Sequence, residues 1–230
     1  MPSFCVYANM QKDWAVEMVM DISQLLMKNG YSYTKDRPDF TIVIGGDGTL
    51  YHYLSELKGK VLLIGSETTY RSQLNNKNWK SRIIRLLRRG KSVRLPLLDV
   101  RSEGVIIGRA MNDVVFHTND HNIVKIKYII DKKVVEFCGD GLIIATPFGS
   151  SAYSYSAGGK KLPLSSSSLS ITPICPYLKR VKPKVSNTNE IDVVAPSNAS
   201  LLLDGKLARV SCQGSIFTIT KSSRHVEFLQ

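Results

Sequence analysis

One acidic residue of this sequence stands in a setting suited to chemistry. Asp47 lies among glycines in the run G-G-D-G-T, residues 45–49. Glycines permit positive φ and let a ligand approach bare backbone N–H groups, which bind phosphate oxygens. The preceding residues 40–44 are apolar or β-branched, as in a strand buried on both faces. A carboxylate at the carboxyl end of such a strand lies where an open α/β sheet binds its ligands.

The whole run is more informative than its central Gly-Asp-Gly, which an ordinary turn with a helix-capping Asp also explains. Its spacing fits neither a Walker A loop nor a Rossmann fingerprint. It resembles the nucleotide-binding turn of NAD kinases, diacylglycerol and sphingosine kinases, and 6-phosphofructokinases. That resemblance implies phosphoryl transfer from a nucleotide and leaves the acceptor open. The donor-phosphate contacts that it implies are Gly45, Gly46, Gly48 and Thr49.

A second cluster of small and hydroxyl residues lies at 139–159, G-D-G-L-I-I-A-T-P-F-G-S-S-A-Y-S-Y-S-A-G-G. Such residues allow close backbone approach and offer hydrogen bonds to a polar ligand, although a Ser-rich flexible loop has the same composition. The segment closely resembles the NAD kinase signature, which lipid kinases and phosphofructokinases are not expected to carry. Further matches to that family are Asn112-Asp113, for its Asn-Glu pair, residues 169–176, and Asp204-Gly205.

The resemblance implies phosphorylation of NAD on the 2′-hydroxyl of its adenosine ribose, which gives NADP. Asp47 would accept the hydroxyl proton, Asn112 and Asp113 would bind adenine and ribose, and Asp140 would contact the nicotinamide side. The donor would be ATP or polyphosphate, with Mg²⁺ held by the donor phosphates and no protein cluster of metal ligands. The implied NAD contacts are Asp47, Gly48, His52, Asn112, Asp113, Asp140, Ser151, Ala152, Tyr153, Ser154, Tyr155 and Ser156.

Some residues depart from the family pattern. Asp113 replaces Glu and reaches one methylene less far, and Phe148 stands where Thr or Ser is common. Ser151, Lys160 and Tyr177 replace Thr, Pro and His. None of these removes the proposed base. Two further roles stay open: His52 also fits an exposed polar helix residue, and Asp204 also fits a plain turn.

The order of predicted elements indicates two domains. Strands at 4–8, 40–44 and 61–64 alternate with helices at 12–28, 49–57 and 80–89, which predicts a doubly wound α/β nucleotide-binding domain over residues 1–93. From 94 to 230 the sequence shows short β-like segments and no long helix, as in a β-sandwich. We expect this β-rich domain to bind NAD, and the last residues are free to pack back on the first domain.

Composition excludes some classes of protein. The 230 residues are 43% hydrophobic, enough for a sizeable core, but contain no apolar run of about 18 residues and no secretory signal pattern. The isolated cysteines Cys5, Cys138, Cys175 and Cys212 lack metal-ligand spacing and favour a reduced, cytoplasmic protein.

The net charge of +12 is concentrated in segment 80–94. Apolar residues at helical spacing within this segment predict an amphipathic helix with a solvated basic face. Binding of a polyanion is the alternative, and no nucleic-acid motif supports it.

Two other functions remain open from the sequence. A lipid kinase could share only the glycine turn, although residues 139–159 would then be unexplained. A non-catalytic dinucleotide-binding protein would leave Asp47 without a chemical role. By resemblance alone we expect a homodimer or homotetramer, without nucleic-acid or membrane partners.

Overall fold

The computed structural model describes residues 1–119, 122–196, 198–211 and 214–230. They form two compact units: Met1–Arg94 together with Val226–Gln230, and Leu95–His225. The predicted fold class, α/β followed by a β-rich part, is confirmed. Cys212, and with it the end of a strand expected at 208–212, lies outside the described residues. The assignment of nucleotide binding to 1–93 and of NAD binding to 94–230 stays a prediction.

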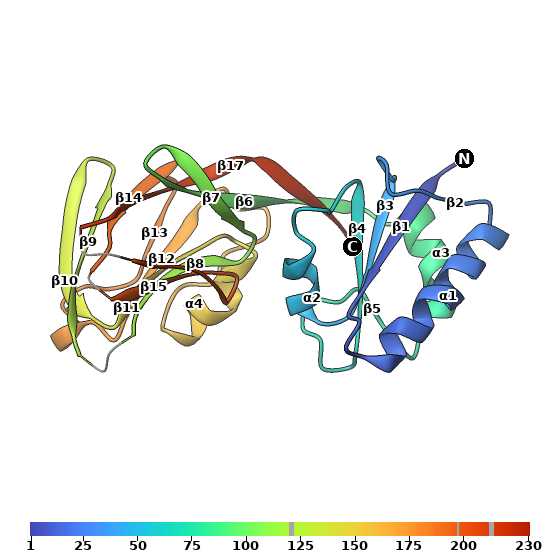
Figure 1. Ribbon diagram of the computed structural model, residues 1–230, viewed down its shortest axis with the longest axis horizontal. Helices are drawn as coiled ribbons and strands as arrows, with labels where there is room; N and C mark the ends of the chain where they lie inside the picture. The colour runs from blue at the N-terminus through green and yellow to red at the C-terminus, as the bar shows by residue number, and fades with distance from the viewer. Residues whose placement is uncertain (120–121, 197, 212–213) are drawn as a thin grey trace. The chain divides into compact units, whose positions relative to one another are not determined.

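The first unit is built on a parallel sheet (Figure 1). Its strands follow the order β2-β1-β3-β4-β5, and the end of β17 pairs with the beginning of β4. Because all these pairs are parallel, the carboxyl ends of the strands share one edge. The strands are β1 (Ser3–Ala8), β2 (Ser32–Tyr33), β3 (Phe40–Ile44), β4 (Lys60–Gly65), β5 (Leu74–Asn75) and β17 (Ile216–Leu229).

Helices cover both faces of this sheet, as expected for a doubly wound unit. Helices α1 (Asp13–Lys28) and α3 (Trp79–Arg89) lie on one face and α2 (Asp47–His52) on the other (Figure 1). Alternate strand residues such as Phe4, Ile42 and Leu62 pack against the apolar sides of α1 and α3.

The helix after the glycine turn is shorter and begins earlier than the predicted 49–57. It starts at Asp47 itself and ends at His52. The chain leaves the helix at Tyr53, whose ring stacks on Tyr7 at 4.6 Å and whose hydroxyl donates to the Ala8 carbonyl at 3.2 Å. These contacts hold the segment after α2 against β1.

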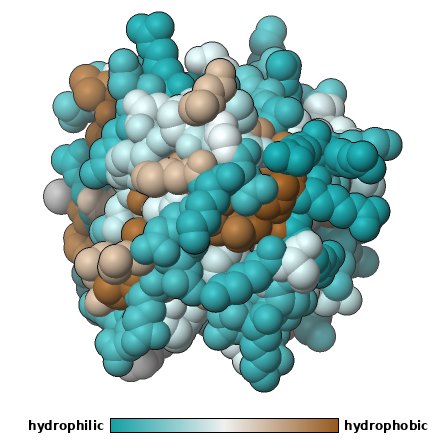
Figure 2. Space-filling view, turned by 90° about the vertical axis from the view of Figure 1, so that its right-hand side faces the viewer, coloured by the Kyte–Doolittle hydropathy of each residue, from teal (hydrophilic) through white to brown (hydrophobic). Residues whose placement is uncertain are grey.

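Helix α3 is the predicted amphipathic basic helix. Trp79, Ile83 and Leu87 are buried, and four arginines, Arg82, Arg85, Arg88 and Arg89, are exposed. Lys80 pairs with Asp21 at 2.8 Å, whereas no acidic group in the described part of the chain forms an ion pair with those arginines. The face that carries α1 and α3 is mostly hydrophilic, with hydrophobic residues in patches (Figure 2).

The second unit is a sandwich of two sheets. One has the order β13-β12-β11-β8-β15-β16, and the other contains β10-β9-β14-β17 with β6 and β7. Residues from both sheets, among them Phe116, Tyr128 and Phe217, form one core between them. The strands are β6 (Ser92–Ser102), β7 (Val105–Ala110), β8 (Asp113–Thr118), β9 (Val124–Ile130), β10 (Lys133–Gly139), β11 (Gly141–Ala145), β12 (Leu169–Ile174), β13 (Lys184–Ser186), β14 (Glu190–Val194), β15 (Ala199–Leu203) and β16 (Lys206–Ser211).

Helical segments of this unit are short, as predicted. They are η1 (Gly149–Ser151), α4 (Tyr153–Ser156) and η2 (Tyr177–Lys179). Across both units, none of the described helices combines the length and apolar character that a membrane crossing requires.

The last strand residues contribute to the core of the first unit. Leu229 is fully buried there. Leu229→Ala should lower the free energy of unfolding of this unit by about 2–5 kcal/mol, because it opens a cavity. Both tryptophans, Trp14 and Trp79, belong to the first unit, so their fluorescence in urea reports its unfolding.

Met20→Ala is the matched control, because Met20 lies on α1 in the same unit and is 68% exposed. It should change the free energy of unfolding by less than about 0.5 kcal/mol. Equal effects of the two substitutions would show that Leu229 is not part of this core.

Candidate active site

The glycine turn places Asp47 at the carboxyl edge of the parallel sheet. Gly45 follows β3 with φ 152°, and a Cβ there would lie 2.3 Å from the Thr49 hydroxyl oxygen, so no other residue fits. Its amide donates to the Ile64 carbonyl of β4 at 2.9 Å. Asp47 is the first residue of α2 and is half-buried. The glycine turn that precedes it is thus fixed to both β3 and β4.

The Asp47 carboxylate is oriented by the segment after β4. Its Oδ1 accepts a hydrogen bond from the Arg71 backbone N–H at 3.3 Å. Burial raises the pKa of Asp47, and the Arg71 amide and positive charge oppose that shift. A raised pKa makes this carboxylate a stronger proton acceptor than an exposed aspartate, as a general base requires.

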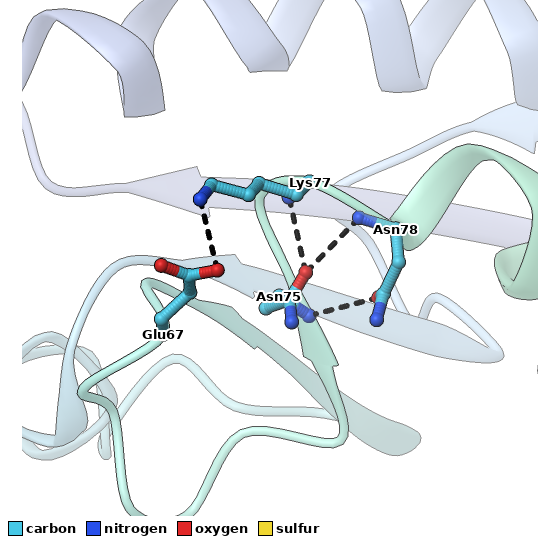
Figure 3. A network of polar contacts seen from close by, with 4 residues as sticks. All are labelled: Glu67, Asn75, Lys77 and Asn78. Carbon is cyan, nitrogen blue, oxygen red and sulfur yellow. Dashed lines mark hydrogen bonds and ion pairs between the residues drawn. The ribbon is translucent and has the colours of Figure 1, made fainter.

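A polar network secures the segment that carries Arg71. The Gln73 side-chain oxygen accepts from the Leu63 amide at 2.7 Å. Farther along, the Asn75 side-chain oxygen accepts from the amides of Lys77 and Asn78 at 3.1 and 3.0 Å (Figure 3). Lys77 pairs with Glu67 at 2.9 Å. The segment is thus held at both ends between β4 and α3.

The second unit contains a pocket of about 410 Å³. Its walls combine aliphatic side chains with carboxylates, an amide, an imidazole and a phenol, as in sites for small polar molecules with a flat ring. The lining residues are Asn112, Asp113, Val115, His117, Ala152, Tyr153, Leu202, Asp204 and Gly205.

Asp204 organises one end of this pocket. Asp204 and Gly205 form the tight turn between β15 and β16, with φ 49° and 76°, the backbone typical of an Asp-Gly hairpin. The Asp204 carboxylate accepts from the amides of Met111, Asn112 and Asp113 at 2.8, 2.6 and 3.2 Å. The structure thus gives Asp204 the turn role that the sequence offered as one alternative, and Asp204 also lines the pocket. Its contact with a ligand stays a prediction.

The T-P-F-G-S-S turn lies against the same segment. The Thr146 hydroxyl donates to the Met111 carbonyl at 2.6 Å and accepts from the Gly149 amide at 3.1 Å. A Cβ on Gly149 would lie only 2.0 Å from the Asn112 carbonyl oxygen, so this approach requires glycine. The contact brings Ala152 and Tyr153, which follow the turn, to the pocket that Asn112 lines.

The two carboxylates at this end of the pocket interact. Asp113 is 4% exposed, and burial together with the nearby Asp204 charge raises its pKa to about 7. Burial also raises the pKa of Asp204, opposed by the three amides that it accepts. Asp113 therefore changes charge near neutral pH.

The structure brings together some of the predicted NAD contacts. Asn112, Asp113, Ala152 and Tyr153 share the pocket. Sequence reasoning missed Val115, His117 and Leu202, yet the alternation of 113, 115 and 117 along one strand could have indicated two of them.

Other predicted residues are not among those that line this pocket. Asp140 occupies the turn between β10 and β11, where its carboxylate raises the pKa of the Cys175 thiol. Tyr155 and Ser156 are exposed, and Ser151 is half-buried. His52 is exposed at the end of α2, with its ring edge-on to Tyr53.

Two side chains of the signature segment are used inside the fold. Ser154 is 0% exposed, and its hydroxyl bonds with those of Ser170 and Thr172 at 3.2 and 2.9 Å. It fastens α4 to β12, so we leave it out of the proposed NAD contacts. Phe148 is 1% exposed, so it packs in the interior rather than facing a ligand.

A glycine turn with a half-buried carboxylate and a polar pocket in a β-rich unit define the class of nucleotide-binding phosphotransferases. A family model described as "ATP-NAD kinase C-terminal domain" matches residues 111–230. The NAD kinase of Thermoplasma acidophilum is 30% identical over 228 residues, covering 95% of this chain and 83% of the relative. The chain belongs to the ATP-NAD kinase family, which confirms the resemblance seen in the sequence.

Solved structures show the same fold. An NAD kinase from Archaeoglobus fulgidus in complex with ATP matches with a TM-score of 0.83 at 22% identity, covering 100% of this chain and 94% of that one. Yeast NADH kinase complexed with NADH matches with a TM-score of 0.83 at 20% identity, covering 100% and 83%.

Asp113 should make the stability of the protein depend on pH. Its pKa is higher in the folded than in the unfolded chain, so the folded state binds the proton more tightly, and stability falls as pH rises from about 4 to 7. Between pH 5.5 and 8, wild type should lose up to about 2 kcal/mol relative to Asp113→Asn, which cannot titrate. Urea unfolding followed by far-ultraviolet circular dichroism measures both. Wild type that gains stability relative to Asp113→Asn as the pH rises would contradict this sign.

Proposed function

We propose that this member of the ATP-NAD kinase family transfers the terminal phosphoryl group of ATP to the 2′-hydroxyl of the adenosine ribose of NAD, which gives NADP. One observation carries the proposal: the Asp47 carboxylate is half-buried on a glycine turn, and its pKa is raised. The family relationship and the similarity to a kinase solved with ATP support the acceptor and the donor.

In this mechanism Asp47 accepts the proton of the 2′-hydroxyl while that oxygen attacks the terminal phosphorus of the donor. The bond from this phosphorus to the bridging oxygen of ATP breaks, and ADP leaves with that oxygen. Because the Gly45 and Thr49 amides already donate to the carbonyls of Ile64 and Gly46, the turn Gly45, Gly46, Gly48 and Thr49 receives the donor phosphates through the amides of Gly46 and Gly48. Phosphoryl transfer requires mainly positioning and stabilisation of charge on the equatorial oxygens, which these amides provide. A positioned base adds roughly 10²- to 10⁴-fold to the rate.

The pocket of the second unit binds the dinucleotide. Asn112 and Asp113 contact adenine and ribose, and Ala152 and Tyr153 offer an apolar surface to a base. Asp140, Ser151, Tyr155, Ser156 and His52 remain proposed contacts from the family pattern, and Gly48 lies against the ligand. The aliphatic and aromatic lining suits a flat ring, and the carboxyl groups suit ribose hydroxyls.

The described residues fit a magnesium ion carried by the donor. No three His, Cys, Asp or Glu side chains gather there as ligands of a metal would. The Asp47 carboxylate is an oxygen ligand of the kind that Mg²⁺ accepts, and the donor phosphates would supply further oxygen ligands. Bound in this way, the ion neutralises phosphate charge during transfer. We extend the proposal to assembly as a homodimer or homotetramer, and light scattering of the purified protein measures the mass of that assembly. We also propose that the protein is cytoplasmic.

Asp47→Asn should lower kcat by roughly 10²- to 10⁴-fold, because the amide cannot accept the hydroxyl proton. The assay uses purified protein, NAD, ATP and Mg²⁺, with NADP read by a coupled dehydrogenase. Asp36→Asn, an exposed change in the same unit, should leave the rate unchanged.

Two outcomes separate the alternatives. Wild-type protein that forms no NADP from any donor would favour a lipid kinase or a non-catalytic dinucleotide-binding protein. NADP formation that survives unchanged in Asp47→Asn would refute the role of Asp47 as the base, while the proposed NAD kinase activity would stand.

Polyphosphate is a second proposed donor, and the exposed arginines of α3 favour it. Changing Arg85, Arg88 and Arg89 to Gln should raise the KM for polyphosphate several-fold and leave the KM for ATP unchanged, because only the long polyanion reaches these charges. The effect should shrink in high salt. A variant with Lys12, Lys28 and Lys35 changed to Gln removes the same charge from other exposed positions of this unit. Equal losses on ATP and polyphosphate would contradict a donor role for α3.

A further inference from the structure

We propose that His117 determines which dinucleotide the pocket accepts, by accepting a hydrogen bond from an exocyclic amino group of the ligand through Nε2. This inference rests on the proposed function, because it assumes that the pocket holds NAD. It concerns a residue that the family pattern used above does not include.

The position of His117 follows from strand β8. Side chains alternate along a strand, so Asp113, Val115 and His117 point to the same face. All three line the pocket. At roughly 3.3 Å per residue, His117 lies about 13 Å along the strand from Asp113. The two residues therefore contact different parts of an extended ligand.

Strand β8 holds this side chain in a fixed frame. It is paired on both sides, with β11 through His117 and Gly141, and with β15 through His117 and Ser200. Leu202, which also lines the pocket, lies opposite Val115 on β15. A group on a doubly paired strand is placed more accurately than one on a loop, as selection between similar ligands requires.

The hydrogen bond of the ring fixes its chemistry. His117 Nδ1 lies 2.8 Å from the Thr118 carbonyl oxygen. A carbonyl only accepts, so Nδ1 carries the proton, and Nε2 of the neutral ring is an acceptor. Elsewhere in the described pocket lining, the side-chain acceptors are the Tyr153 hydroxyl and, toward the opposite end of β8, the carboxylates and the Asn112 amide. Nε2 thus gives the His117 end of the pocket a neutral acceptor.

The ligand that fits this arrangement carries an amino group on or beside a flat aromatic ring. Val115, Leu202 and Ala152 supply aliphatic surface for the ring. NAD has two such groups, the amine of adenine and the carboxamide of nicotinamide. Each is removed by one analogue, nicotinamide hypoxanthine dinucleotide or nicotinic acid adenine dinucleotide.

The test measures kcat/KM for NAD and both analogues in wild type, His117→Phe and His117→Gln. Wild type should prefer NAD over one analogue by roughly 5- to 30-fold, the effect of one hydrogen bond. His117→Phe should abolish that preference, and His117→Gln, which places an acceptor near the position of Nε2, should retain most of it. The analogue concerned identifies the amino group. His225→Gln, an exposed histidine outside the pocket, should change nothing.

The ratio between substrates separates recognition from folding. His117→Phe, together with a smaller variant, His117→Leu, loses the bond to Thr118. A purely structural role of this bond predicts that each of these two variants loses activity equally on every substrate. Equal losses, or a preference that His117→Phe retains against both analogues, would overturn the inference. Wild-type protein that makes no NADP from NAD would instead refute the proposed function.

Discussion

The candidate binding pocket depends on one interaction, the capture of three successive amides by the Asp204 carboxylate. The amides of residues 111–113 donate to this one half-buried side chain, and buried amides are costly to leave without partners. Because the Asp204 turn and this segment fix each other, Asn112 and Asp113 have little freedom. The Thr146 hydroxyl and the close approach of Gly149 then bring Ala152 and Tyr153 to the same pocket.

The same interaction sets the electrostatics of the pocket. Asp204 keeps its hydrogen bonds to the amides, and its charge acts on Asp113, which lies in a desolvated position. A carboxyl group that titrates near pH 7 can accept from ribose hydroxyls when ionised and donate when neutral. The glycine turn shows the same principle in the first unit, where burial raises the pKa of Asp47 and the hydrogen bond from the Arg71 amide lowers it. In both places backbone amides orient a carboxylate that burial makes more basic.

Local patterns made part of this architecture predictable from the sequence. A buried strand followed by glycines indicates a ligand-binding turn, so the place of Asp47 at the carboxyl end of β3 follows from neighbouring residues alone. The alternation of apolar and basic residues likewise predicted α3 with its exposed arginines. The resemblance of residues 139–159 to a family signature brought Ala152 and Tyr153 to attention, and both line the pocket.

Contacts between distant residues were not predictable in this way. Asp204 reaches amides that lie more than 90 positions earlier in the chain, and no local pattern encodes that pairing. Ser154 resembles its hydroxyl neighbours in sequence, yet packing against Ser170 and Thr172 buries it. Arg71 escaped notice because its backbone, not its side-chain type, donates to Asp47.

The central claim is that Asp47 receives the proton from the adenosine 2′-hydroxyl of a bound NAD. A crystal structure of the protein with NAD tests it most directly. We expect a 2′-oxygen within about 3.2 Å of a carboxylate oxygen of Asp47, the reach of a general base. An adenosine ribose that binds with its 2′-oxygen far from Asp47, in fully occupied and well-ordered density, would contradict it.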